Sequence, residues 1–209
     1  RKAVLRVDRH LHQYGVSGAL RAELQFFMHI LHALAPTRTI VNRQAKRFLV
    51  SMLPTGTVTF LFTDIEGSTK LWERHREKMG RDLARHDALL RTHVERRQGY
   101  VFKTVGDAFC AAFDRATDAL DAAIAAQHAL LAEAWQVPGG IRVRMALHTG
   151  AAEERDGDYF GPALNRMARL LSIGYGGQVL ISLVTAELLR DNLPEDAALL
   201  DLGPHRLKD

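Results

Sequence analysis

Residues 57–69 read Thr-Val-Thr-Phe-Leu-Phe-Thr-Asp-Ile-Glu-Gly-Ser-Thr, and the organisation of the chain follows outward from them. The β-branched and aromatic run predicts a buried strand over 57–64, which carries one carboxylate, Asp64, at its end. Gly67, Ser68 and Thr69 then predict the start of a helix. A carboxylate beside the free N–H groups of a helix start suits a metal-bound polyphosphate, so these three residues are candidate phosphate ligands.

A second carboxylate lies in a tight turn further along the chain. Residues 100–109 read Tyr-Val-Phe-Lys-Thr-Val-Gly-Asp-Ala-Phe and predict strands over 100–105 and 108–113, joined at Val105-Gly106-Asp107. Taken singly, Asp64 is more simply a helix cap and Asp107 a turn residue. Together, on neighbouring strands, they predict a site for one or two Mg²⁺ ions.

The remaining periodicities complete a regular alternation. A helix is expected over 69–97, broken near Gly80. Asp114 and Thr117 are expected to cap another, alanine-rich helix that runs to about Trp135. A strand over 142–149, a helix over 161–172 and a strand over 178–182 follow. The order β-α-β-β-α-β predicts an α+β fold, a ferredoxin-like sandwich with one antiparallel sheet and helices on one face.

Lys103 lies inside one of the predicted strands. Strict alternation puts it on one face with Val101, and Phe102 with Thr104 on the other. A lysine flanked by apolar residues requires a partner if it is buried. The alternative is a lysine at a solvent-facing strand position.

A third segment, residues 156–169, reads Asp-Gly-Asp-Tyr-Phe-Gly-Pro-Ala-Leu-Asn-Arg-Met-Ala-Arg. Pro162 suits the first position of a helix, and Asn165 and Arg169 then share one helical face. An amide and a guanidinium so placed can contact a ribose and a phosphate. A solvated polar stripe is the simpler alternative, but the adjoining Asp156 and Asp158 favour a site.

Composition restricts the function classes. Of 28 Lys and Arg residues, nine lie in residues 1–51 beside only two acidic ones, so the net charge of +4 comes from the N-terminal quarter and gives no ground for nucleic-acid binding. The lone Cys110 lies in an apolar run and predicts a buried thiol rather than a disulfide. No run is long enough to span a membrane, and none resembles a signal peptide.

The chain divides near Pro54-Thr-Gly56. Residues 1–51 are expected to form a basic helical extension, with helices over 16–35 and from 39 to about 50. Residues 53–209 are expected to form the main domain.

The three segments, in this order, resemble the catalytic domain of class III nucleotidyl cyclases, the adenylate and guanylate cyclase superfamily, and notably its actinobacterial branch. The resemblance runs from about Leu53 to Asp209 and implies the cyclase fold, with C-terminal additions to the ferredoxin-like unit. It implies that Asp64 and Asp107 bind two Mg²⁺ or Mn²⁺ ions per site, with the carbonyl of Ile65 close to a metal.

The resemblance also assigns nucleotide contacts. Lys103 and Asp158 match the pair that selects adenine, and Asp158 is preferred to Asp156 because it lies seven residues before Asn165. Asn165 matches the residue that orients the ribose, and Arg169 the one that stabilises the transition state. These positions hold the residues of an active adenylate cyclase.

The resemblance therefore implies a cytoplasmic enzyme that converts ATP to 3′,5′-cyclic AMP and pyrophosphate. It implies a homodimer that shares its active sites, with Asp64 and Asp107 from one subunit and Lys103, Asp158, Asn165 and Arg169 from the other. Additional regulatory domains outside this chain are also expected.

Three alternatives remain at this stage. A guanylate cyclase is disfavoured by Lys103 and Asp158, because guanine reverses the donor and acceptor that adenine presents. A diguanylate cyclase is disfavoured because the turn reads Val-Gly-Asp-Ala-Phe rather than Gly-Gly-(Asp/Glu)-Glu-Phe. The third is a catalytically silent, cyclase-like domain that binds nucleotide and regulates a partner.

Overall fold

The computed structural model describes residues 3–8 and 53–203; the helices predicted over 16–35 and 39–50 lie outside these ranges. The strands are β1 (Ala3–Asp8), β2 (Gly56–Ile65), β3 (Tyr100–Val105), β4 (Ala108–Phe113), β5 (Val143–Arg155), β6 (Asp158–Phe160), β7 (Val179–Ser182) and β8 (Ala197–Asp201). The helices are α3 (Ser68–Arg96), α4 (Ala116–Ala132), α5 (Pro162–Ser172) and α6 (Leu183–Leu189).

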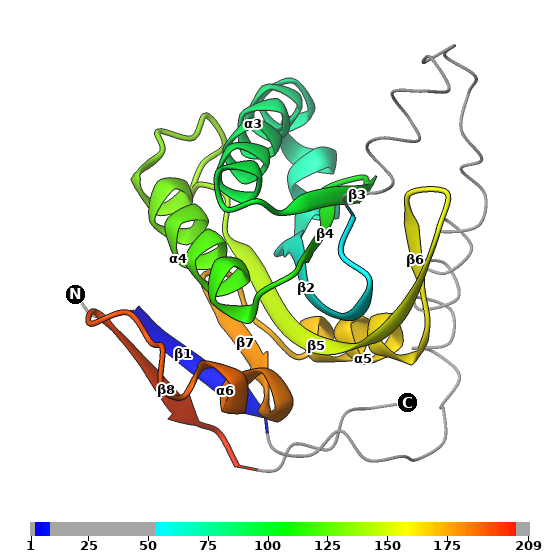
Figure 1. Ribbon diagram of the computed structural model, residues 1–209. Coiled ribbons are helices and arrows are strands. Elements are labelled where there is room, and N and C mark those ends of the chain that lie inside the picture. Colours follow the sequence, from blue (N-terminus) through cyan, green and yellow to red (C-terminus); the bar gives the residue numbers. More distant parts are fainter. Residues whose placement is uncertain (1–2, 9–52, 204–209) are drawn as a thin grey trace.

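One sheet organises these elements, with strand order β3-β4-β2-β5-β7-β1-β8 (Figure 1). Its first four strands are antiparallel to one another and alternate along the chain with α3 and α4. This part is the predicted ferredoxin-like βαββαβ unit, which is confirmed. Beyond β5 the sheet is mixed, because β7 runs parallel to β5 and β1 runs parallel to both β7 and β8.

Helices cover both faces of the sheet. Leu61 of β2 belongs to the core beneath α3 and α4. Phe60 and Phe62, which point the other way, belong to a second core with Met167 and Leu170 of α5. The expectation of helices on one face holds for α3 and α4, whereas α5 lies on the opposite face. β2 is therefore buried on both sides, which fixes the strand that delivers Asp64.

Helix boundaries differ locally from the predictions. The backbone of α3 leaves helical geometry at His75, not near Gly80. Gly80 remains helical, because a glycine lowers helix stability without forcing a break. α4 begins after Arg115 without a side-chain cap and ends at Ala132, so neither Asp114 nor Thr117 caps it.

Several elements have no counterpart among the predicted ones. β5 continues six residues past the expected end at Thr149 and turns back as β6, forming a hairpin (Figure 1). β1, α6 and β8 extend the sheet region at its far edge. These segments are short, so their periodicity carries little signal.

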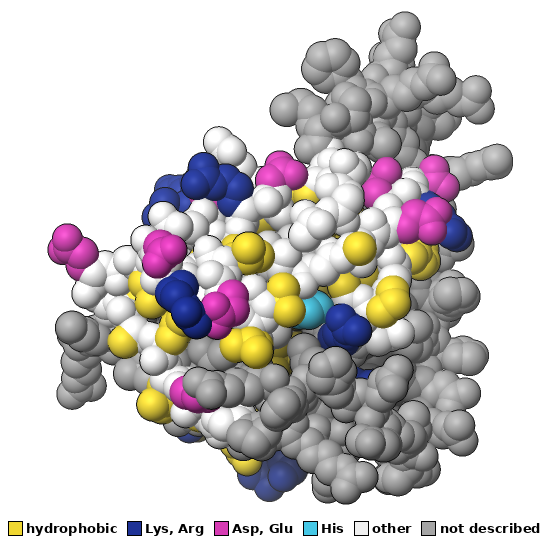
Figure 2. Space-filling view, turned by 60° about the horizontal axis from the view of Figure 1, so that its bottom comes forward, with side chains coloured by type: hydrophobic (Ala, Val, Ile, Leu, Met, Phe, Trp, Pro, Cys, Tyr) yellow, Lys and Arg dark blue, Asp and Glu magenta, His cyan; other side chains and the backbone are white. Residues whose placement is uncertain are grey.

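The surface carries charges of both signs. On the face shown in Figure 2, basic and acidic side chains are interspersed among apolar ones. None of the helices in the described part of the chain combines the length and apolar character that a bilayer crossing requires.

Candidate active site

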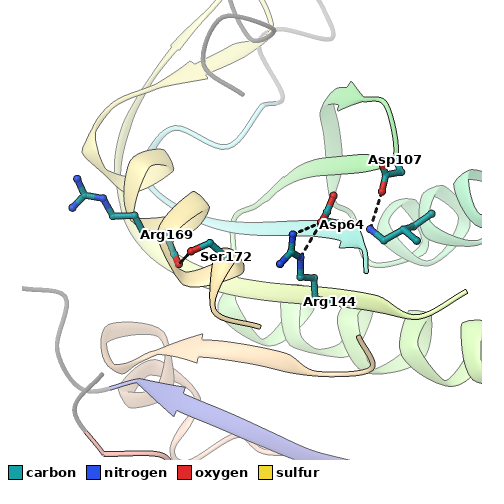
Figure 3. A network of polar contacts seen from close by, with 6 residues as sticks. Asp64, Asp107, Arg144, Arg169 and Ser172 are labelled. Atoms are coloured by element: carbon teal, nitrogen blue, oxygen red, sulfur yellow. Dashed lines mark hydrogen bonds and ion pairs between the residues drawn. The ribbon is translucent and has the colours of Figure 1, made fainter. Parts of the chain in front are cut away.

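Asp64 lies at the end of β2 beside an arginine of the next strand. The register pairs Asp64 with Arg144 of β5, and the guanidinium donates from Nε and Nη2 to Asp64 Oδ2 at 2.8 and 2.5 Å (Figure 3). Both side chains are largely buried, with 22% of Asp64 and 30% of Arg144 exposed. A two-pronged ion pair therefore holds the carboxylate in place.

The turn between β3 and β4 delivers Asp107 to the same place. Gly106 takes a positive φ of 59°, which glycine adopts without strain, and Asp107 follows it. Asp107 Oδ2 accepts a hydrogen bond of 3.0 Å from the backbone N–H of Ile65, the residue after Asp64. The structure thus brings together the two carboxylates and the Ile65 backbone.

The charges in this cluster favour a cation. Burial raises the pKa of Asp64 above its usual value, Arg144 opposes that rise, and the negative charge of Asp107 adds to it. A divalent cation would relieve the repulsion between the two carboxylates, whose oxygen donors suit Mg²⁺ or Mn²⁺. No group of three or more His, Cys, Asp or Glu side chains forms a metal site within residues 3–8 and 53–203. Water, backbone carbonyl or phosphate oxygens would have to complete the coordination.

Helix α3 starts immediately after this cluster. Gly67 adopts the left-handed conformation, with φ 69° and ψ 24°, and its carbonyl accepts the N–H groups of Lys70 and Leu71. The first N–H groups of a helix have no partner within it. Those of Ser68 and Thr69 therefore lie at the helix end adjoining Asp64.

A second cluster contains Lys103 and Asp158. The predicted strict alternation in β3 is wrong, because a bulge between Val101 and Lys103 shifts the register and sets Lys103 opposite Cys110. Cys110 and Phe102 both belong to the core under α5, so Lys103 shares their face. There the Lys103 ammonium donates to Asp158 Oδ2.

The surroundings of this pair separate the two candidate acidic residues. Only 19% of the Lys103 side chain and 25% of the Asp158 side chain are exposed. Asp156 is exposed in the hairpin turn with a φ of 55°. The geometry therefore joins Lys103 to Asp158, the residue that the family resemblance favoured, and not to Asp156.

The predicted ribose and phosphate contacts lie on α5. Asn165 is exposed and Arg169 is half-buried, and the Arg169 carbonyl accepts a hydrogen bond of 2.7 Å from Ser172 Oγ. Figure 3 shows the Arg169 side chain extending from α5 away from Asp64 and Arg144. One chain therefore assembles the two carboxylates in one place and the lysine–aspartate pair in another, and it directs Arg169 toward neither carboxylate.

Arg144 was not identified from the sequence as a residue of the candidate site. An arginine between the apolar residues Val143 and Met145 was a signal, but its partner followed only from the register of β5 on β2. The prediction for Cys110 is confirmed: the thiol is buried, and burial raises its pKa to about 12.

Comparisons with known proteins identify the family of this chain. The sequence model of the adenylate and guanylate cyclase catalytic domain matches residues 50–208. An uncharacterised protein of Mycobacterium tuberculosis is 43% identical over 157 residues, covering 74% of this chain and 53% of that protein. The adenylate cyclase of Neurospora crassa is 34% identical over 154 residues, covering 62% of this chain and 7% of that protein.

A solved structure gives the same result for the fold. An adenylate cyclase of Trypanosoma brucei in its monomeric state aligns with a TM-score of 0.61 and 31% identity, covering 68% of this chain and 79% of that one. The chain spans about half the length of the mycobacterial relative. The match to residues 50–208, on this fold, establishes that the chain belongs to the family of class III adenylate and guanylate cyclase catalytic domains.

Proposed function

We propose that this domain is an adenylate cyclase, which converts ATP to 3′,5′-cyclic AMP and pyrophosphate with two divalent metal ions at the interface of a homodimer. The observation that carries the proposal is the ion pair between Lys103 and Asp158, formed in the same chain that joins Asp64 to Asp107. Lys103 and Asp158 would recognise the adenine base, and Asp64 and Asp107 would bind the metal ions. The proposal includes a cytoplasmic location, where ATP is available as the substrate.

The choice of ATP rests on hydrogen-bond complementarity. Adenine presents an acceptor at N1 and a donor amine at N6, which match the ammonium of Lys103 and the carboxylate of Asp158. Guanine presents a donor at N1 and an acceptor at O6, which would leave both partly buried side chains mismatched. Buried mismatches of this kind discriminate strongly between substrates.

The reaction joins two ends of one substrate molecule. The ribose 3′-oxygen forms a bond to the α-phosphorus, the bond from that phosphorus to the bridging oxygen breaks, and pyrophosphate leaves. The 3′-hydroxyl proton passes to a substrate phosphate or to water. Bound metal ions would supply an acidified 3′-hydroxyl and neutralise the leaving group.

The chain's own residues would bind and orient the substrate. Asp64, Asp107 and the Ile65 carbonyl would hold the metals, and Arg144, once released from Asp64, would face the phosphates as a positive charge. The backbone N–H groups of Ser68 and Thr69, with that of Gly67, would donate hydrogen bonds to the phosphate oxygens. Asn165 would orient the ribose, and Arg169 would donate to the α-phosphoryl oxygens as their charge grows.

The homodimer is proposed because of where Arg169 points. Its direction away from Asp64 supports a site in which one copy supplies Asp64 and Asp107, while the other supplies Lys103, Asp158, Asn165 and Arg169. Each homodimer would then have two equivalent sites. The chain spans about half the length of its mycobacterial relative. We therefore also propose, as part of the same hypothesis, that longer proteins containing this domain have this activity and carry regulatory domains.

The test measures products and complementation. The purified chain is supplied with ATP or GTP and with Mg²⁺ or Mn²⁺, and cyclic nucleotides are quantified. We expect cyclic AMP from ATP, inactivity of Asp64→Ala and of Arg169→Ala alone, and partial recovery when the two variants are mixed. Cyclic GMP as the main product would favour a guanylate cyclase. No product from a folded dimer with either nucleotide would favour a silent domain.

A further inference from the structure

The spacing between Lys103 and Asp158 does not come from the sheet. Among the described strands, Lys103 lies on β3, which pairs with β4, and Asp158 on β6, which pairs with β5. No backbone ladder therefore connects the two strands that carry the pair. The distance between Lys103 and Asp158 therefore depends on side-chain contacts between β3 and β6.

Tyr159 supplies the main contact between these strands. It is the buried residue of the three in β6, with 2% of its surface exposed. Its ring meets Phe102 edge-on, with centroids 5.0 Å apart, and Phe60 of β2 at 5.3 Å. Phe102 directly precedes Lys103, and Tyr159 directly follows Asp158. The two rings in contact are thus the immediate neighbours of the two paired charges.

The Tyr159 hydroxyl gives this contact an anchor. It donates a buried hydrogen bond of 2.8 Å to the carbonyl of Pro54, which precedes β2. Burial, with the nearby carboxylate of Glu154, raises the pKa of the hydroxyl, so it stays a neutral donor. The ring is therefore fixed at its tip by Pro54 and at its sides by Phe60 and Phe102.

The backbone of Tyr159 also acts on Asp158. Its N–H donates at 2.8 Å to Asp158 Oδ1, while Oδ2 accepts from Lys103. Both carboxylate oxygens are thereby oriented, one by Lys103 and the other by the residue that Pro54 anchors. A displacement of Tyr159 would turn the carboxylate away from the direction in which it could accept an amine.

We propose that Tyr159 is a positioning residue for purine selectivity, which sets the Asp158 carboxylate against Lys103 through its ring on Phe102 and its hydroxyl on the Pro54 carbonyl. This inference rests on the proposed function, because it assumes that Lys103 and Asp158 read the base. It adds that the segment at the start of the catalytic domain, Leu53 to Thr55, is connected to base recognition by one hydrogen bond.

The test removes that hydrogen bond alone. Tyr159→Phe keeps the ring and deletes the hydroxyl. We expect the ratio of kcat/KM for ATP to that for GTP to fall about tenfold. This is the effect expected when one hydrogen bond that orients Asp158 is lost. The control is Trp135→Phe. Trp135 follows α4, and its indole N–H donates a hydrogen bond of 3.0 Å to the carbonyl of Leu130 within α4. The substitution removes a comparable side-chain-to-carbonyl bond and should leave the ratio unchanged.

Two results would overturn the inference. One is an unchanged ratio in folded Tyr159→Phe, and the other is an equal fall in Trp135→Phe, which would show a general effect of stability. If the wild type preferred GTP, the proposed substrate would be wrong, yet the preference should still weaken in Tyr159→Phe alone.

A second measurement does not depend on turnover. Hydrogen exchange in residues 155–161 should accelerate about tenfold in Tyr159→Phe, while exchange in β2 stays as in the wild type. Unchanged exchange in residues 155–161 would contradict the anchoring of β6 even if the wild type proved inactive.

Discussion

The proposed site has a metal end, Asp64 and Asp107, and a base-reading end, Lys103 and Asp158, and the structure of each chain holds these two ends in different ways. Asp64 and Arg144 are directly opposed in the ladder between β2 and β5, and β2 is buried on both faces. Lys103 and Asp158 lie on strands that share no ladder within residues 3–8 and 53–203 and meet through side chains. Main-chain pairing tolerates side-chain changes better than side-chain packing does, so the metal end should be the more rigid of the two. Substitutions should therefore separate turnover from selectivity.

The largest effect is expected at the metal end. Asp64→Asn removes a proposed metal ligand and leaves Arg144 facing a neutral amide, so turnover of ATP should fall by about three orders of magnitude. Cyclic AMP formation under saturating Mn²⁺ measures this loss. Asp121→Asn is the matched control, because it also removes a carboxylate paired with an arginine, Arg97, at 3.3 Å. A similar loss in both variants would contradict the metal assignment.

A smaller and more selective effect is expected at the base-reading end. Lys103→Met deletes the donor proposed for adenine N1, and kcat/KM for ATP should fall about 100-fold, the value of a hydrogen bond to a charged group. The rise in melting temperature caused by Mn²⁺ should stay as in the wild type. If that rise disappeared, the two ends would not be independent.

The pH dependence of stability examines the framework between the two ends. His148 is buried on β5, its Nδ1 is 2.8 Å from Ser182 Oγ, and its Nε2 has no partner among the described residues. Burial, assisted by the positive charge of Arg166, lowers the pKa of His148 to about 4. Between pH 6.5 and pH 4, His148 is therefore protonated in the unfolded chain but stays neutral in the folded chain.

The free energy of unfolding should therefore be unaffected by His148 above pH 6.5 and should fall by about 2 kcal/mol between pH 6.5 and pH 5. Urea unfolding at several pH values measures this slope. His148→Gln should flatten it, whereas a substitution at the exposed His128 should not. An equal slope in His148→Gln would assign the effect to other groups.

The smallest effect concerns Arg144. Arg144→Met removes the charge that neutralises Asp64 in the metal-free chain, so stability without metal should fall by about 1 kcal/mol. Mn²⁺ should then raise the melting temperature at lower concentration than in the wild type, because no guanidinium competes for Asp64. Thermal unfolding across a Mn²⁺ titration measures both changes. A need for more Mn²⁺ would show that Arg144 assists metal binding.

Local patterns in the sequence determined the βαββαβ unit, because strand and helix periodicity there is strong and the turns carry glycine. They also singled out Asp64, Asp107 and Lys103, because carboxylates at strand ends and a lysine among apolar residues are unusual in a buried core. The choice of Asp158 over Asp156 came from the resemblance to the cyclase family. The bulge in β3 was not visible, since one extra residue reverses alternation without changing composition.

Only the tertiary structure decided which residues meet. Arg144 reaches Asp64 because β5 and β2 pair in one register, although the two are far apart along the chain. Tyr159 reaches Pro54 and Phe102 because the hairpin of β5 and β6 folds back over β3. Periodicity reports which face of its own element a side chain takes, whereas register and packing set its partner on another element. Residue types thus indicated the candidate residues, and long-range pairing decided which of them lie together.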